Sequence, residues 1–291
     1  MEKFPTPARN PVALSHASPF STAVGRSDCE TLAMVHRAIE RHDVLLAFQP
    51  IFPAANLERP AVHEGLIRVL DDMGRVVPSH DFIGAIETNE LGRKLDCLAL
   101  ELGLKALAET PGLRLSLNMS ARSIGWPEWT RILNRGLARD ETAGERLILE
   151  ITEASAMTMP ELVSVFMSEM HLKGISFAID DFGAGYTSFR YLRELHFDIL
   201  KMSGEFVSGI AHNPDNQVLT KALFSIAEHF EMFTVAEGVE TAEDASWLAQ
   251  AGVHCMQGYY FGAPTTMPPW NATGDGAVDP GHPRSAPRAS S

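Results

Sequence analysis

The sequence lacks the features of a secreted or membrane-inserted protein. Only three cysteines occur in 291 residues, and Cys29, Cys97 and Cys255 are far apart. An odd number of widely spaced cysteines does not suggest a disulfide framework, so reduced thiols are expected. No stretch approaches ~18 consecutive apolar residues, and no basic start followed by an apolar run opens the chain. These absences predict a soluble, cytoplasmic protein without membrane insertion.

The chain also lacks an excess of positive charge. Its formal net charge is −13, from 24 Lys and Arg against 37 Asp and Glu. Surfaces that bind polymeric nucleic acid or anionic membranes are basic, so the charge argues against both partners. A small phosphate ester is still compatible with this charge, because bound cations and a few arginines can reverse its sign locally.

The order of apolar patterns predicts one folded domain. Residues 1–30 have little periodicity and are predicted to be a flexible segment, and residues 267–291, rich in Gly, Pro, Ala and Ser, a disordered tail. Between them, strand patterns at LLAFQPIF and AVHEGLIRVL alternate with helical ones. The helices are predicted over residues 30–41, 82–87, 91–108, 159–172, 216–230 and 242–251. This alternation predicts an α/β fold of the (β/α)8-barrel type over residues 31–266.

Six apolar stretches end on residues suited to binding a metal ion or a phosphate. They recur about every 28 residues, close to the ~30 of a βαβ unit, and in a closed parallel barrel their ends meet on one face. The terminal residues are Asn118, Glu150, Asp180 with Asp181, Lys201, Glu237 and Gln257.

Two interpretations of these strand ends are open for any single position. Polar residues end strands wherever a solvated loop begins, so one such residue means little. The set favours a metal site, because it contains four carboxylates, the oxygen ligands that Mg²⁺, Mn²⁺ and Ca²⁺ select. No Cys/His spacing suggests zinc.

Ordered motifs connect the chain to a known family. Glu64-Gly65-Leu66, followed by Ile67 and Arg68, resembles the Glu-Ala-Leu signature of the EAL domain family, and FQPIF precedes it. The family comprises phosphodiesterases and receptors for the bacterial second messenger cyclic di-GMP. The motifs that follow in the family's order are FIGAIE, SLNMSAR, LEITEA, IDDFGAGYTSF, AEGVET and QGYYFGAP.

The resemblance implies a modified (β/α)8 barrel that hydrolyses cyclic di-GMP to linear pGpG, expected as a homodimer and as a target of a regulatory protein partner. It implies two Mg²⁺ or Mn²⁺ ions per site. One would be held by Glu64, Asn118, Glu150 and Asp180. The other would be held by Asp180, Asp181 and Glu237.

The remaining roles are also carried over by motif. Glu64, Lys201 and Glu237 would be the catalytic residues, with Lys201 polarising the attacking water and Glu237 a candidate base. Arg68 would contact a ligand phosphate. The other residues expected at the substrate are Gln49, Leu66, Gln257 and Glu240.

Departures from the family pattern leave a second reading open. Gly65 replaces the usual Ala, and Ser203 replaces an Asp two residues after Lys201, which removes a carboxylate from the same strand face. Glu205 follows in place of a usual serine and is a candidate to compensate for the lost charge, but the sequence does not show where its side chain points. The alternative is therefore a catalytically weak or inactive module that binds cyclic di-GMP or a protein partner. Gly183 and Gly185 are either turn residues or part of the family's dimer-linked loop.

Overall fold

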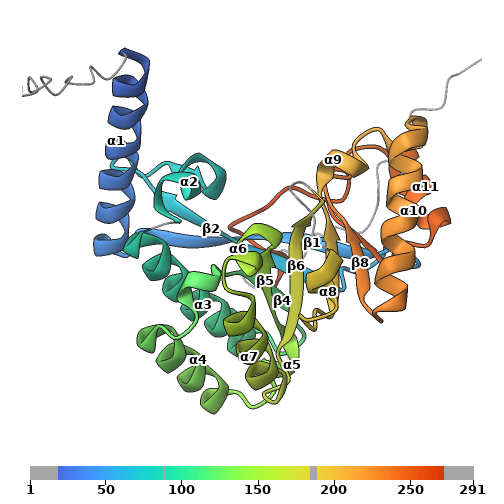
Figure 1. Ribbon diagram of the computed structural model, residues 1–291. Helices are drawn as coiled ribbons and strands as arrows, with labels where there is room; N and C mark the ends of the chain where they lie inside the picture. Colours follow the sequence, from blue (N-terminus) through green and yellow to red (C-terminus); the bar gives the residue numbers. More distant parts are fainter. Residues whose placement is uncertain (1–18, 88, 184–188, 272–291) are drawn as a thin grey trace, which may run out of the picture.

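A closed eight-stranded barrel forms the centre of the computed structural model, which describes residues 19–87, 89–183 and 189–271 (Figure 1). The strand order is β1-β9-β8-β7-β6-β5-β4-β2-β3, and pairing of β1 with β2 closes the ring. Strand β3 pairs only with β2, as an arm outside the ring. The strands are β1 Val44–Pro53, β2 Val62–Leu70, β3 Val76–Pro78, β4 Leu115–Asn118, β5 Leu147–Thr152, β6 Ser176–Phe182, β7 Ile199–Met202, β8 Phe233–Ala236 and β9 Cys255–Met256. The predicted modified (β/α)8 barrel is confirmed.

Strand β1 is the part of the ring that differs from a parallel barrel. It runs antiparallel to both of its neighbours, β2 and β9, and it extends from Val44 to Pro53 with Pro50 inside it. Pro50 lies two residues after Phe48, whose N–H points away from β2 to Thr265. Residues two apart in a strand point their N–H groups in the same direction, so the nitrogen of Pro50 also points away from β2. On that side β9 pairs with Phe52 and Pro53 but not with Pro50. The proline therefore interrupts no ladder hydrogen bond.

Helices surround the barrel. The helices predicted over residues 91–108, 159–172, 216–230 and 242–251 are present with ends shifted by at most two residues, whereas the one predicted over residues 30–41 begins at Pro19. In Figure 1, α3, α4 and α7 lie on one side and α10 and α11 on the other. Local caps fix several ends: Asn89 Oδ1 accepts from Leu91 N at 2.8 Å before α3, and Pro160 begins α7. The α-helices are α1 Pro19–Arg41, α2 Ile83–Ile86, α3 Glu90–Glu109, α4 Pro127–Arg139, α5 Ala143–Arg146, α6 Glu153–Thr158, α7 Pro160–His171, α8 Phe189–Leu192, α9 Gly204–Val207, α10 Pro214–His229 and α11 Ala242–Ala251. The short 3₁₀ helices are η1 Ser79–Asp81, η2 Ala121–Ser123, η3 Ile210–His212 and η4 Pro269–Asn271.

Both ends of the domain differ from the expected boundaries. Helix α1 begins at Pro19, inside the segment expected to be flexible, and proline suits a first helical position because its missing N–H costs no hydrogen bond there. At the other end, Trp270 is partly buried and packs against the main core, so order continues beyond residue 266. Residues 1–18 and 272–291 lie outside the described ranges.

The core has two parts. The main cluster joins the barrel strands to α3, α4, α7, α10 and α11, and a smaller one joins α1 and α2 to the upper part of β2. Close packing of α3 on the barrel explains the unusual Gly65: an added Cβ would lie 2.7 Å from Leu117 Cδ2, a buried side chain that also contacts Gly103 of α3. A larger residue at position 65 requires Leu117 to move.

Among the described residues, no helix is both long and apolar enough to cross a membrane.

Candidate active site

Lys201 lies at the centre of the predicted strand-end cluster. Its side chain comes from β7 and is 2% exposed, and its Nζ is 2.6 Å from Glu150 Oε2 and 2.8 Å from Glu237 Oε1. Asp180 Oδ1 is 3.0 Å from the same nitrogen and Glu64 Oε2 is 3.7 Å away. Side chains from five strands or strand ends therefore converge at the carboxyl ends of the barrel strands, as the sequence predicted.

Two neutral amides fix the carboxylate of Glu64. Asn118 Nδ2 donates to Glu64 Oε1 at 2.9 Å, and Gln257 Nε2 donates to Oε2 at 2.6 Å. Gln257 Nε2 is also 3.2 Å from Gln49 Oε1, and Gln49 Nε2 donates to Gly262 O at 3.1 Å. The chain of amides runs across the junction between β9, β1 and β2, and it sets the direction of Glu64.

Burial and like charge govern the protonation of this cluster. Burial raises the pKa of Glu150 well above its ordinary value and raises the pKa of Glu237 to about 8, with Lys201 opposing both shifts. Burial would lower the pKa of Lys201, but the four surrounding carboxylates outweigh it and hold that pKa well above its ordinary value. The single Lys201 ammonium thus faces four buried or partly buried carboxyl groups, so the site has more negative than positive charge when these groups are ionised.

A bulge at the end of β6 separates the two adjacent aspartates. The pairing of β6 with β7 shifts register between Ile179 and Phe182, and Asp181 has φ of 52°. Such bulges re-aim side chains next to functional sites. Glu153 Oε2 accepts from Gly183 N at 3.3 Å and supports the start of the following loop. Gly185, the other glycine of that motif, lies outside the described residues.

A cleft of about 310 Å³ opens beside the carboxylate cluster. Five predicted residues line it: Gln49, Glu64, Leu66, Glu237 and Gln257, and the exposed Glu240 joins them at the rim. Arg68 does not line this cleft. Its Nη1 donates to Ile67 O and lies 3.5 Å from Ser79 Oγ, and burial lowers its pKa. Asn118 and Asp181 are exposed, and the former reaches the cluster through Glu64.

Ser203, which stands where the family has an aspartate, has a local structural role. Strand β7 ends at Met202, and Ser203 is the N-cap of α9, with its Oγ accepting from Glu205 N at 3.4 Å. Aspartate and serine both suit that position, so the exchange preserves a helix cap. The exposed Glu205 is not among the carboxylates within 4 Å of Lys201 in the described part of the chain.

Tyr259 and three glycines line the cleft but were not predicted from the sequence. Tyr259 is 70% exposed at the rim, and Gly204, Gly238 and Gly258 form part of the wall. Gly258 has φ of 157°, and a Cβ there would lie 2.1 Å from Val239 O. The Gln-Gly-Tyr-Tyr run was visible in the sequence, but nothing in one sequence distinguishes a wall glycine from a turn glycine.

Asp96 of α3 supports the loop that follows Asn118. Its Oδ2 accepts from Ser123 Oγ at 2.5 Å and from Ser120 N at 3.0 Å. Burial raises the pKa of Asp96 to about 6, although both hydrogen bonds lower it. The folded state therefore holds a proton that the unfolded chain, with an ordinary aspartate, releases near pH 4.

This difference predicts a pH-dependent stability. Because the folded pKa is raised, the protein is expected to lose about 1–2 kcal/mol of unfolding free energy as the pH rises from about 4 to about 6.5. Asp96→Asn keeps an acceptor for both serines and removes the titration. Urea unfolding of the two proteins at several pH values should show that the unfolding free energy of the variant, relative to wild type, increases as the pH rises. Equal pH slopes for the two proteins would contradict the assignment.

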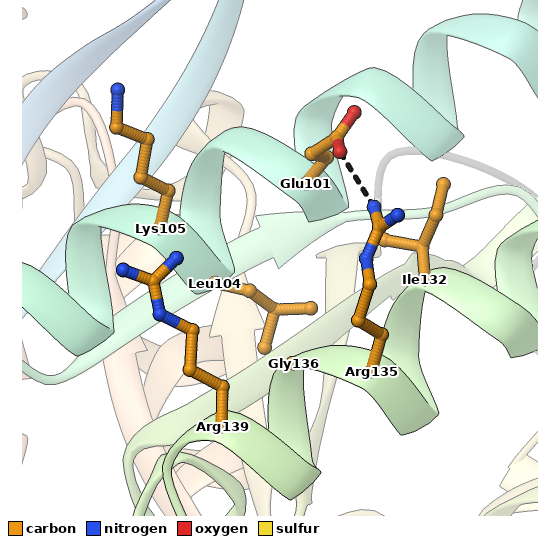
Figure 2. A pocket seen from close by; sticks show the side chains of 7 residues that line it. All are labelled: Glu101, Leu104, Lys105, Ile132, Arg135, Gly136 and Arg139. Atoms are coloured by element: carbon orange, nitrogen blue, oxygen red, sulfur yellow. Dashed lines mark hydrogen bonds and ion pairs between the residues drawn. The ribbon is translucent and has the colours of Figure 1, made fainter.

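A second hollow lies away from these residues, between α3 and α4 (Figure 2). Lys105, Arg135 and Arg139 surround an apolar floor that includes Leu104, and Arg135 pairs with Glu101 at 2.6 Å. None of the predicted site residues lines it.

The residues of the cluster fit hard divalent cations. All its potential ligand atoms are oxygens, from five carboxylates and the Asn118 amide, and the buried Asp180 Oδ1 accepts no hydrogen bond although Lys201 lies 3.0 Å away. In the part of the chain that the structure describes, no three Asp, Glu, His or Cys side chains yet surround a common metal position. The Lys201 ammonium lies between them instead.

These features define an α/β-barrel protein with an acidic site at the carboxyl ends of its strands. The model of the EAL domain family matches residues 32–264, which is most of the chain. The chain belongs to the EAL domain family.

Comparisons with known proteins agree with this assignment. The probable cyclic di-GMP phosphodiesterase PdeA of Escherichia coli (strain K12) is 32% identical over 240 residues, covering 81% of this chain and 32% of that protein. The chain spans about a third of the length of the curated relatives it matches.

Solved structures show the same barrel. The PaMucR phosphodiesterase in complex with c-di-GMP matches with a TM-score of 0.73 and 25% identity, over 81% of this chain and 97% of that one. The FimX EAL domain from Pseudomonas aeruginosa bound to c-di-GMP matches with a TM-score of 0.74 and 26% identity, with the same coverage.

Proposed function

We propose that this chain is a divalent-cation-dependent phosphodiesterase that hydrolyses cyclic di-GMP to linear pGpG. The observation that carries the proposal is the convergence of Glu64, Glu150, Asp180 and Glu237 within 3.7 Å of Lys201 Nζ, beside an open cleft. Relatives named as cyclic di-GMP phosphodiesterases support the substrate.

The residues would form two ligand sets that share Asp180. Mg²⁺ or Mn²⁺, when bound as a pair, activates water and neutralises charge on the phosphate. Glu64, Asn118 and Glu150 complete one set with Asp180. Asp181 and Glu237 complete the other.

The remaining groups hold the reactants. Lys201 orients the attacking water and offsets charge on the phosphate, while Glu237 is the candidate base that takes a proton from that water. Gln49, Leu66, Glu240 and Gln257 position the dinucleotide in the cleft. Arg68 contacts a phosphate of the dinucleotide after its side chain rotates away from Ser79.

Alanine at position 64 tests this assignment. Loss of the Glu64 carboxylate is expected to lower kcat at least about 100-fold, since even removing a partner of a metal ligand costs 10- to 100-fold. Glu228→Ala, which removes an exposed carboxylate from α10 outside the cleft, serves as the matched control and should retain wild-type turnover. Formation of pGpG is followed by chromatography.

The same variant separates the enzyme from a binding module. A protein that only binds cyclic di-GMP or a protein partner would retain that binding in Glu64→Ala and would show no turnover in wild type. The FimX EAL domain structure contains bound c-di-GMP, so binding of this dinucleotide alone does not demonstrate hydrolysis. Turnover and binding must therefore be measured separately. Ser203 caps α9 but supplies no carboxylate beside Lys201, so this replacement favours the binding module.

Homodimer formation, regulation by a protein partner and a cytoplasmic location belong to this proposal. All three follow from the family resemblance or from composition.

A further inference from the structure

The junction between β9 and β1 is one of the two least paired parts of the barrel, together with the junction between β8 and β9. Strands β9 and β1 share two residue pairs, Phe52 with Met256 and Pro53 with Cys255. Above them, the Gln49 side chain contacts Gln257 and Gly262, and Gln257, Gly258 and Tyr259 line the cleft. At the level of Gln49, β1 is therefore paired with β2 but not with β9.

Residues 262–271, called here the C-terminal strap, restore contact with β1 above this gap. Phe48 N donates to Thr265 O at 2.8 Å and Thr265 N donates back to Phe48 O at 3.1 Å. Gly262 O accepts from the Gln49 side chain. Residues 265–271 of the strap lie beyond the range matched by the EAL family model.

Trp270 anchors the strap on the outer surface of the barrel. Its ring meets Phe48 edge-on with centroids 5.2 Å apart, and it meets His63 edge-on at 4.7 Å. Phe48 and His63 are adjacent in sequence to Gln49 and Glu64, which point to the opposite side of their strands. Gln49 and Glu64 are themselves paired in register. One aromatic ring thus holds both strands directly behind the two site residues.

We infer that Trp270 is a positioning residue, which holds Glu64 and Gln49 at the height needed to bind the divalent cation and the dinucleotide. This inference rests on the proposed function, because it assigns a purpose to the placement of Glu64. Its action passes through the strands: Trp270 packs on Phe48 and His63, and their neighbours Gln49 and Glu64 both contact the Gln257 amide, which directs Glu64 Oε2.

Mn²⁺ binding measured by calorimetry without cyclic di-GMP tests the inference. Trp270→Ala is expected to weaken Mn²⁺ binding about 10-fold or more, the range found when support for a metal ligand is removed. Trp270→Phe keeps an aromatic edge against Phe48 and should stay within about 3-fold of wild type. In turnover assays, raising the Mn²⁺ concentration should recover most of the kcat of Trp270→Ala.

Trp247→Ala is the matched control. Trp247 is another partly buried tryptophan packed on the core, but it lies on α11 over Lys221. The Trp247→Ala substitution should lower the melting temperature without changing the Mn²⁺ affinity. If Trp270→Ala is too unstable, Trp270→Leu, measured where all variants are folded, should show the same weakening.

Unchanged Mn²⁺ affinity in folded Trp270→Ala or Trp270→Leu would overturn the inference, as would an equal loss in Trp247→Ala. Absence of pGpG from wild type would refute the proposed hydrolysis but leave the comparison of Mn²⁺ affinities intact.

Discussion

Replacing Lys201 by methionine is expected to lower the free energy of unfolding in metal-free buffer by about 3–5 kcal/mol. The substitution keeps the length of the side chain and removes the only ammonium within 4 Å of four carboxylates among the described residues. Breaking a buried ion pair costs this much, because the charge left behind has lost its water. Mn²⁺ should restore part of the stability by supplying positive charge.

Turnover should not recover with stability. If Lys201 orients the attacking water, kcat of Lys201→Met is expected to fall by about 100-fold or more even at saturating Mn²⁺. Lys105→Met provides the control, because Lys105 is exposed and its nearest carboxylate, on Glu109, is 4.0 Å away. Urea unfolding with a chelator gives the first quantity and pGpG formation gives the second. A Lys201→Met protein as stable as Lys105→Met would contradict the central position of the ammonium.

Arg146→Ala is expected to cost a similar 3–5 kcal/mol at the opposite end of the barrel, without a specific effect on chemistry. Arg146 Nη1 donates to three backbone carbonyls, Leu107 O at 3.0 Å, Thr110 O at 3.1 Å and Leu113 O at 3.1 Å. Its Nη2 pairs with Asp140, and its side chain is 11% exposed. Removing it leaves the three carbonyl oxygens and Asp140 Oδ2 without this donor, while Thr142 still donates to Asp140 Oδ1.

Lysine at position 146 should recover only part of this loss, because a single ammonium cannot reproduce the fork of the guanidinium. Arg135→Ala is the comparison, since its pair with Glu101 is 65% and 52% exposed and should contribute less than about 1 kcal/mol. Thermal and urea unfolding measure all three variants. Equal losses in Arg146→Ala and Arg135→Ala would refute the role assigned to Arg146.

The strand-end residues show how far one sequence leads. Asn118, Glu150, Asp180 and Lys201 end apolar stretches at a regular interval, and a closed barrel has one rim where such ends meet. Their grouping could thus be predicted without coordinates. The side on which Glu64 and His63 point was also predictable, since alternate residues of a strand face opposite ways.

Long-range contacts could not be predicted in this way. The antiparallel direction of β1 depends on closing the ring, and the packing of Trp270 on His63 joins residues 207 positions apart in a segment that composition marks as tail. The capping role of Ser203 depends on where β7 ends, and strand ends are poorly fixed by local pattern. The hydrogen bonds that turn Arg68 toward Ile67 and Ser79 are likewise tertiary.

The most direct test of the central claim is product analysis after purified protein is incubated with cyclic di-GMP and Mg²⁺ or Mn²⁺, with a chelated control. The account predicts that pGpG appears with either ion and disappears with the chelator. Binding of cyclic di-GMP without any pGpG, under conditions where the protein is folded and the cation is bound, would contradict it.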